Sequence, residues 1–240
     1  MRSSFRVHRS VAMAVLLAFV ASNVMVGSGP SDFDHSTTAK PSPAPSSIAS
    51  LQSFPLAFED RSGGSGAGGP FVSRAYGYTI SLTASEAVLT FPDKFNANVL
   101  RTRLVGADPQ AKPVGLDPLP VRFNYLIGND PSRWKTDVLT YGRIRYDDVY
   151  PGIDLIYHGT AGEPEYDFVV NPGGQPGAIA LDFSGASGFR IDADGDLVLS
   201  LASGEIVQHR PVMYQQTAGG QRPVSGGFVG LGPNRVGLEV

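Results

Sequence analysis

The sequence contains no cysteine and a single tryptophan in 240 residues. A chain without cysteine cannot be a small disulfide-stapled domain or a cysteine-dependent enzyme, so its fold must rest on an apolar core alone. The nucleophile elbow G-x-S-x-G and a phosphate-binding loop followed by Lys-Ser or Lys-Thr are also missing. Histidine is scarce, and His158 and His209 do not have the spacing of a metal-binding pair, so we expect both at strand edges or turns.

The first 28 residues have the pattern of an export signal. Three arginines precede an apolar stretch from Val11 to Val20, and small residues follow at positions 21–22 and 27–28. A positive start, a short apolar core and small residues after it are typical of a secretory signal that is cleaved. An uncleaved anchor is the alternative, but an apolar stretch extended to Val26 is still shorter than the roughly 20 residues that span a membrane. We therefore expect an exported protein, secreted or held at the cell surface or in the periplasm.

Positive charge is in short supply once that signal is removed. The whole chain has 19 Lys and Arg against 22 Asp and Glu, and residues 1–28 contain three of the basic residues and no acidic one. The remaining chain then has 16 basic and 22 acidic residues, a net charge of −6. An acidic surface does not attract nucleic acid or anionic lipid. We expect no nucleic acid partner, and no membrane association after the signal is cleaved.

A spacer and one domain follow the signal. Residues 29–50 are mostly Ser, Thr, Ala and Pro, which bury too little apolar surface to fold, so this segment is predicted to be disordered. Residues 51–240 form the predicted domain, and the Gly-rich run at 62–69 is expected to be a mobile loop inside it. The last residues, 235–240, have the pattern of a strand. This strand either closes a sheet or belongs to a domain truncated at its C-terminus, and we favour truncation.

Apolar and polar residues alternate in short runs from residue 71 onward. Examples are residues 78–82, 165–170, 179–183 and 197–201, with Gly- and Pro-containing turns between the runs. Period-two alternation is the pattern of antiparallel strands with one buried face. The only helical signal is local, at Pro131 after a capping Asn129 or Asp130. We predict an all-β fold, an antiparallel β-sandwich-like domain of about a dozen short strands.

Several short motifs in order make the domain similar to a known bacterial family. They are Pro55-Leu-Ala-Phe-Glu59, Gly77-Tyr-Thr-Ile-Ser-Leu82, Glu86-Ala-Val-Leu89, Asn124-Tyr-Leu-Ile-Gly-Asn-Asp-Pro131 with Trp134, Tyr141-Gly, Tyr150-Pro-Gly-Ile-Asp154, Glu165-Tyr-Asp-Phe168, Asp194-Gly-Asp-Leu197 and His209-Arg-Pro211 with Tyr214-Gln215. With these motifs the chain resembles the DUF7948 family, a domain of unknown function on the N-terminal side of SBBP-type β-propeller repeats in exported bacterial proteins. The resemblance implies a module of a larger surface protein, with such repeats as candidate partners. It implies no catalytic mechanism.

Three carboxylates gather at Glu163, Glu165 and Asp167. A glycosidase uses two carboxyl groups about 5–10 Å apart, and residues i and i+2 of one strand are about 6–7 Å apart. However, the alternation assigns Tyr166 and Phe168 to the buried face, which leaves the carboxylates on the outer face. A solvated strand face is therefore the favoured interpretation, and a glycoside hydrolase-like enzyme is the third hypothesis for the chain.

The aspartates Asp192, Asp194 and Asp196 resemble a calcium-binding loop only in part. An EF-hand loop needs Gly at position 6 and a bidentate Glu at position 12, whereas this chain has Gly195 at position 4 and Ser203 at position 12. We favour a hairpin whose Asp-Gly step supplies a positive φ. A weak calcium site is the alternative, and no other cofactor is expected.

Aromatic residues cluster in the middle third of the chain. Carbohydrate-binding sandwiches stack such rings on sugar faces, and the candidate ligand-binding residues are Trp134 and Tyr141. Tyr157 alternates in phase with the apolar residues of its strand and is expected in the core. Trp134 is predicted to cover the core, with an exposed platform as the alternative.

These observations lead to three functional hypotheses. The first is a non-catalytic structural or interaction module of an exported bacterial protein, accessory to a larger repeat-containing surface protein. The second is a carbohydrate-binding β-sandwich module with a glycan as partner, and the third is the hydrolase above. Because no catalytic set is assembled in the sequence, we expect that the chain is not an enzyme.

Overall fold

The protein is an all-β domain in the computed structural model, which describes residues 10–16, 55–61, 71–75, 77–92, 98–160, 162–217 and 220–240, with the backbone alone at 10–16 and at residue 217. The strands pair antiparallel throughout these ranges, so the predicted fold class is confirmed. There are twenty strands in the described residues rather than about a dozen, because many are only three to five residues long.

The strands have the following bounds: β1 Ser10–Leu16, β2 Phe58–Asp60, β3 Phe71–Ala75, β4 Tyr78–Leu82, β5 Glu86–Phe91, β6 Asn98–Leu104, β7 Pro113–Pro118, β8 Phe123–Tyr125, β9 Lys135–Val138, β10 Thr140–Tyr150, β11 Ile153–Thr160, β12 Glu163–Val170, β13 Ala180–Ser184, β14 Gly188–Ile191, β15 Leu197–Leu201, β16 Gly204–Gln208, β17 Val212–Thr217, β18 Gly220–Pro223, β19 Gly227–Gly232 and β20 Arg235–Glu239. Two single 3-10 turns, η2 at Pro131–Arg133 and η3 at Pro176–Ala178, complete the regular structure of the described residues.

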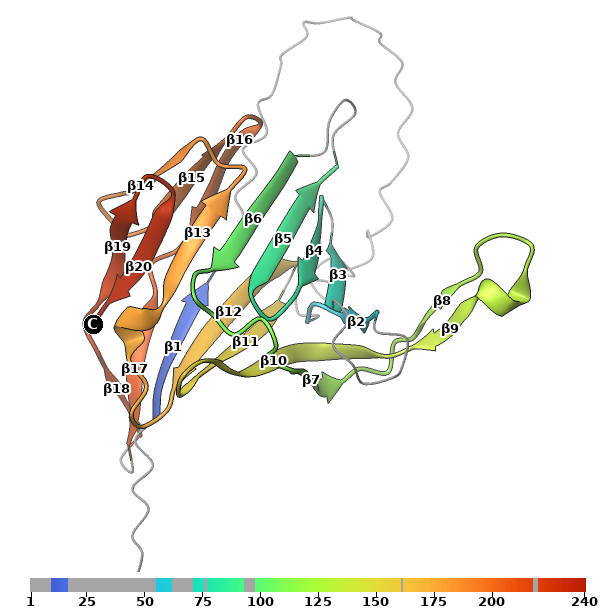
Figure 1. Cartoon of the computed structure of the whole chain (residues 1–240), viewed down its shortest axis with the longest axis horizontal. Coiled ribbons are helices and arrows are strands. Elements are labelled where there is room, and N and C mark those ends of the chain that lie inside the picture. Colours follow the sequence, from blue (N-terminus) through green and yellow to red (C-terminus); the bar gives the residue numbers. More distant parts are fainter. Residues whose placement is uncertain are drawn as a thin grey trace, which may run out of the picture.

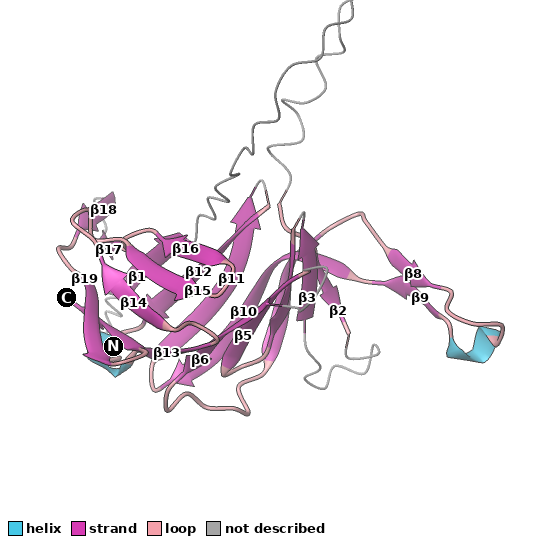
Figure 2. Ribbon diagram, turned by 90° about the horizontal axis from the view of Figure 1, so that it is seen from above, coloured by secondary structure: helices cyan, strands magenta, loops and turns pink. Residues whose placement is uncertain are grey.

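The long strand β10 forms the corner between two layers (Figure 1). One of its edges pairs with β7, and the opposite edge pairs first with β2 and then with β11. From this corner the path of paired strands runs two ways, through β11, β12, β1, β17 and β18, and through β2, β3, β4, β5, β6, β13, β20 and β19. The two parts face each other across the core, as Figure 2 shows from above. This is the sandwich-like arrangement expected from the sequence.

The apolar core lies between β4, β5, β6 and β13 on one side and β11 and β12 on the other. Every second residue of β12 is buried there, and Phe168 at its centre is fully covered. Tyr78, Ile80 and Leu82 of β4 are buried in the same alternating way. Burial of each such side chain stabilises the fold by about 1.5–3 kcal/mol. The period-two pattern of the sequence therefore identified the buried faces of these strands correctly.

A separate sheet of β14, β15 and β16 adds to the core. Its Leu197, Leu199 and Ile206 belong to the main apolar cluster. The Tyr166 hydroxyl of β12 donates a hydrogen bond of 3.1 Å to Oε1 of the buried Gln208 at the end of β16. This bond gives the buried tyrosine hydroxyl a polar partner, which a buried polar group requires.

The N-terminal segment is described only at Ser10–Leu16, where it forms strand β1 between β12 and β17. The rest of the predicted signal, the predicted spacer at 29–50 and the Gly-rich run at 62–69 lie outside the described residues. A search of the described part of the chain finds no helix of the length and apolarity that a membrane crossing requires.

Candidate functional site

A long hairpin, which we call the arm (residues 119–139), extends from the start of β10 away from the two layers (Figure 1). It consists of β8, η2 and β9, with Phe123 opposite Val138 and Tyr125 opposite Lys135. The turn begins as the sequence predicted, because the Asp130 side chain accepts the N–H of Ser132 and Pro131 opens η2. The arm therefore has a defined local structure although it makes few contacts with the core.

The arm exposes apolar side chains along its whole length. None of its 21 residues is buried, and six of its large hydrophobic residues are exposed: Val121, Phe123, Leu126, Ile127, Trp134 and Leu139. Ile127 is 74% exposed. Clusters of exposed apolar side chains on soluble proteins mark surfaces that bind something.

A buried carboxylate fixes the base of the arm to β2. Glu59 is 1% exposed, and its side chain pairs with Arg74 of β3 and with Arg61. The Tyr125 hydroxyl of β8 donates a hydrogen bond to Glu59, and it accepts hydrogen bonds from Arg61 at 3.0 Å and Arg74 at 2.9 Å. A buried carboxylate needs such partners, because an unpaired buried charge is strongly destabilising. Glu59 therefore links the arm to both arginines.

The two arginines also lie close to the Tyr125 ring. Their guanidinium carbons are 4.8 Å (Arg61) and 5.8 Å (Arg74) from the ring centroid, within the range of cation–π attraction. Partial burial lowers the pKa of Arg74, but hydrogen bonds to Glu59 and Tyr125 outweigh this and raise the pKa above its ordinary value. Arg74 therefore stays charged under all ordinary conditions.

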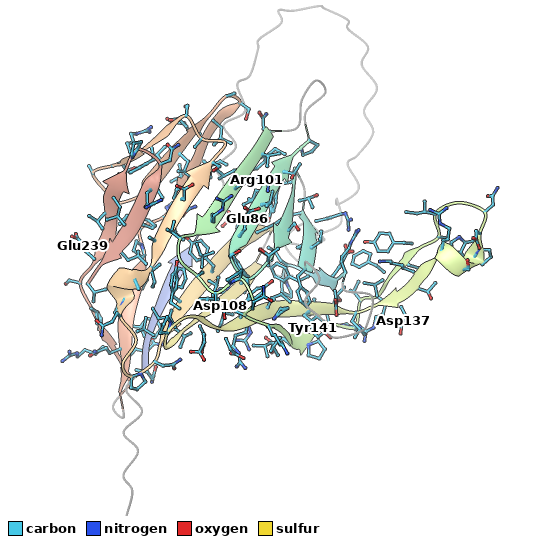
Figure 3. The ribbon with its side chains drawn as sticks, viewed as in Figure 1. Glu86, Arg101, Asp108, Asp137, Tyr141 and Glu239 are labelled. Carbon is cyan, nitrogen blue, oxygen red and sulfur yellow. The ribbon has the colours of Figure 1, made fainter. Side chains whose placement is uncertain are left out.

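Between the arm and the end of β2 lies a cleft of about 660 Å³. It is lined by Asp60, Arg61, Tyr125, Ile127, Arg133, Trp134, Lys135, Thr136, Asp137, Val138 and Leu139. Figure 3 shows Asp137 on the arm, with Tyr141 at the base of the arm. Three of the lining side chains are basic, two are acidic and two are aromatic. A volume of about 300–1,000 Å³ is typical of sites for small ligands.

Of the two aromatic residues predicted to bind a ligand, only Trp134 lines the cleft. Trp134 lines the cleft, is 37% exposed, and donates its Nε1–H to the Gly128 carbonyl oxygen at 3.1 Å. The prediction that it covers the core is wrong, because the arm holds it away from the two layers. Tyr141 does not line the cleft: its ring contacts Phe71 edge-on and covers Gly115, where a Cβ would lie 2.6 Å from the ring. Tyr157 is buried in the core, as predicted.

The three carboxylates of β12 lie on its outer face, as predicted, with His158 of β11 between two of them. His158 Nε2 is 3.0 Å from Asp167 and Nδ1 is 3.5 Å from Glu165. Burial lowers the pKa of His158, but the hydrogen bond to Asp167 and the charges of Asp167 and Glu165 outweigh it and raise the pKa. Burial raises the pKa of Glu165 against the opposite effect of His158. The cleft contains none of Glu163, Glu165 and Asp167.

The three aspartates proposed for calcium lie in the turn between β14 and β15. Asp192 Oδ1 accepts the N–H groups of Asp194 at 2.9 Å and Asp196 at 3.0 Å, and Gly195 has a φ of +83°. Asp196 accepts the Arg210 N–H and pairs with His209 Nδ1, each at 2.8 Å. Burial raises the pKa of Asp196, but these two partners outweigh it and lower the pKa.

These contacts are those of a hairpin, and calcium binding at this turn stays a prediction. Within the ranges that the structure describes, no group of three or more His, Asp or Glu side chains is arranged to hold a metal ion.

No pattern in the sequence indicated directly that one side of the cleft is basic. Arg61 and Arg133 are far apart in the chain, and they line the same cleft only because the arm folds beside the end of β2. One sequence pattern pointed weakly to this basic side, since Arg133 and Lys135 flank the only tryptophan.

Comparison with known proteins identifies the domain. A family model for a domain of unknown function, DUF7948, matches residues 62–240. The chain belongs to the DUF7948 family. The match includes the whole arm, so the arm is part of the DUF7948 domain, while Glu59, Asp60 and Arg61 directly precede the matched range. No curated protein and no solved structure matches the chain.

Proposed function

We propose that this DUF7948 domain is a non-catalytic interaction module that holds a partner against the arm and the cleft behind it. One observation carries the proposal: 21 consecutive residues contain no buried side chain and expose six large apolar ones. Exposed apolar surface is unfavourable in water, and a partner that covers it would gain the free energy of its burial.

The anchoring of the arm supports the proposal. The contacts of Tyr125 with Glu59, Arg61 and Arg74 hold the base of the hairpin in one position. A binding surface that is ordered before it meets its partner loses less conformational entropy on binding. The arm is therefore suited to binding rather than to serving as a loose connection.

The arrangement of acidic groups supports a non-catalytic role. The carboxylates nearest to a glycosidase pattern lie on β12, on an outer strand face, and His158 engages two of them. A hydrolase activity that disappears in the Glu165→Gln variant would contradict the proposal. Following the resemblance, we further propose that the module is exported and works within a larger surface protein with β-propeller repeats.

The experiment is site-specific photo-crosslinking in cells that produce the protein. A benzophenone amino acid at position 127 inserts into C–H bonds of any partner within reach, whatever the class of the partner. We expect adducts from position 127 and none from position 112, where Lys112 is also exposed to solvent but lies outside the arm and the cleft. Equal yields at both positions, or none at 127 in correctly folded protein, would overturn the proposal.

A further inference from the structure

The cleft has an excess of positive charge that its own acidic residues do not balance. The side chains of Arg133 and Lys135 have no hydrogen-bond or ion-pair partner among the residues that the structure describes. Asp137 is directed to a different cation, since Arg122 Nε lies 3.6 Å from its Oδ1. Two free cations on one wall of a concave site favour a ligand that carries negative charge.

The opposite side of the cleft adds further positive charge. There Arg61 and Arg74 both pair with the buried carboxylate of Glu59. Arg61 itself lines the cleft and is partly exposed. An anionic group between Arg61 and the pair Arg133 and Lys135 would meet basic side chains from both sides.

The cleft also contains flat aromatic surface. The Trp134 ring is held by its hydrogen bond to the Gly128 carbonyl, and the Tyr125 ring is held by Glu59 and the arginines. Aromatic faces of this kind present an apolar surface with a polar end, which suits ligands whose rings carry both C–H and O–H groups.

Hydrogen-bond acceptors lie beside the basic side chains of the cleft. The carboxylates of Asp60 and Asp137 and the hydroxyl of Thr136 line the same space. Ionised carboxylates only accept hydrogen bonds, so they disfavour a ligand that is purely anionic and favour one that also donates O–H groups. A hydroxyl-bearing acid offers such donors around its ring, whereas poly-glutamate offers donors only through its backbone N–H groups.

We infer that the cleft binds an acidic saccharide, a short chain of uronic-acid residues. The carboxylate of the saccharide would contact Arg61, Arg133 and Lys135. Its hydroxyls would donate hydrogen bonds to Asp60, Thr136 and Asp137. Its ring faces would contact the Trp134 ring. The inference rests on the proposed function, because it names the chemistry of the partner held at the arm. The cleft volume of about 660 Å³ fits a ligand of this size class.

The test is a fluorescence titration of the full chain, in which Trp134 is the only tryptophan and therefore reports on the cleft directly. The probes are an oligogalacturonide, a neutral oligogalactoside of the same length and a poly-glutamate peptide of the same charge. We expect a saturable shift in Trp134 emission with the oligogalacturonide only. Neutralising one cation in Lys135→Gln should weaken this binding about tenfold, the loss of one charge-assisted contact, and added salt should weaken it further.

Lys112→Gln is the matched control, because it removes the same charge from an exposed position outside the cleft, and it should bind as the unmodified chain does. Arg133→Gln removes the other cation from the same side of the cleft, and it tests oligogalacturonide binding a second time. Equal binding of the neutral probe, preference for poly-glutamate, or no shift with any probe would each overturn the acidic saccharide. None of these results alters the crosslinking yield at position 127, so the proposed function can stand or fail separately.

Discussion

The Tyr125 hydroxyl donates a hydrogen bond to the Glu59 carboxylate across 66 positions of the sequence. This contact joins the first strand of the arm to β2, at the point where Glu59 is shielded from solvent. Arg61 and Arg74 approach the same two groups, so the base of the arm is held by charge-assisted hydrogen bonds. The orientation of the exposed arm therefore depends on a small cluster of side chains around the buried Glu59.

Removing the Tyr125 hydroxyl should loosen the arm. In Tyr125→Phe, the hydrogen bond to a charged group is lost, which is worth about 1.5–3 kcal/mol. We expect amide hydrogen exchange in residues 122–138 to become at least about tenfold faster, while the core strands β4, β11 and β12 exchange as before. Tyr214→Phe is the control, since the Tyr214 hydroxyl has no hydrogen-bond partner among the described residues. Unchanged exchange in the arm would show that Tyr125 does not hold it.

Neighbouring residues of β12 should differ sharply in their contribution to stability. Phe168 is fully buried, so Phe168→Ala should reduce the free energy of unfolding by about 3–5 kcal/mol. Asp167 is half-buried on the other face and has one hydrogen bond to His158, so Asp167→Ala should cost about 1 kcal/mol. Urea unfolding followed by circular dichroism measures both values. Equal, small costs would mean that the faces of β12 are assigned wrongly.

The His158 cluster should make stability depend on pH. The folded state raises the pKa of His158 above its ordinary value of 6.5, so the folded protein binds this proton more tightly than the unfolded chain. The stabilising contribution is complete below pH 6.5 and is lost as the pH rises through the folded pKa. Burial and the charge of Arg143 lower the pKa of His158, and the hydrogen bond to Asp167 with the charges of Asp167 and Glu165 raises it by more.

The measurement is the free energy of unfolding between pH 5.5 and pH 8.5. We expect a decline with rising pH in this interval, and a smaller decline in Asp167→Asn, which keeps the shape of the side chain and removes its charge. The decline should be smallest in His158→Asn. An identical slope in all three proteins would contradict the assignment to His158.

The turn after β14 should depend on Asp192 without any need for calcium. Asp192→Ala removes the acceptor of two backbone N–H groups and should cost about 0.5–2 kcal/mol, as loss of a helix-capping side chain does. Asp194→Ala should cost almost nothing, because its carboxylate has no partner among the described residues. Thermal melts with millimolar calcium and with a chelator check the alternative. A midpoint that rises with calcium in the unmodified chain, and not in Asp192→Ala, would establish a calcium site.

Local patterns in the sequence predicted the local structure well. The alternation along β4 and β12 identified buried and exposed faces, because a strand repeats every two residues wherever it occurs. The cap at Asp130 and the positive φ at Gly195 were also predictable, since both depend on residues within one turn. These features need no knowledge of which strands become neighbours.

The arm and the cleft could not be predicted in the same way. Trp134 lies in a polar turn and was expected to cover the core rather than to form an exposed platform. The sequence does not show that the whole turn extends away from the two layers. Arg61 and Arg133 line one cleft because β10 forms the corner and directs the arm past the end of β2. Contacts between distant segments are set by topology, which no periodic pattern records.

The position of β1 matters if the predicted export signal is cleaved. β1 pairs antiparallel with both β12 and β17, so these two strands run in the same direction and lie two strand spacings apart, about 9–10 Å. Its residues, Ser10–Leu16, fall within the predicted export signal. If a signal peptidase removes that segment, it takes a strand from the middle of a sheet and leaves two facing rows of unpaired backbone groups. Export, cleavage and completion of the sheet would then be one coupled event, finished only when β12 and β17 close on each other or receive another strand.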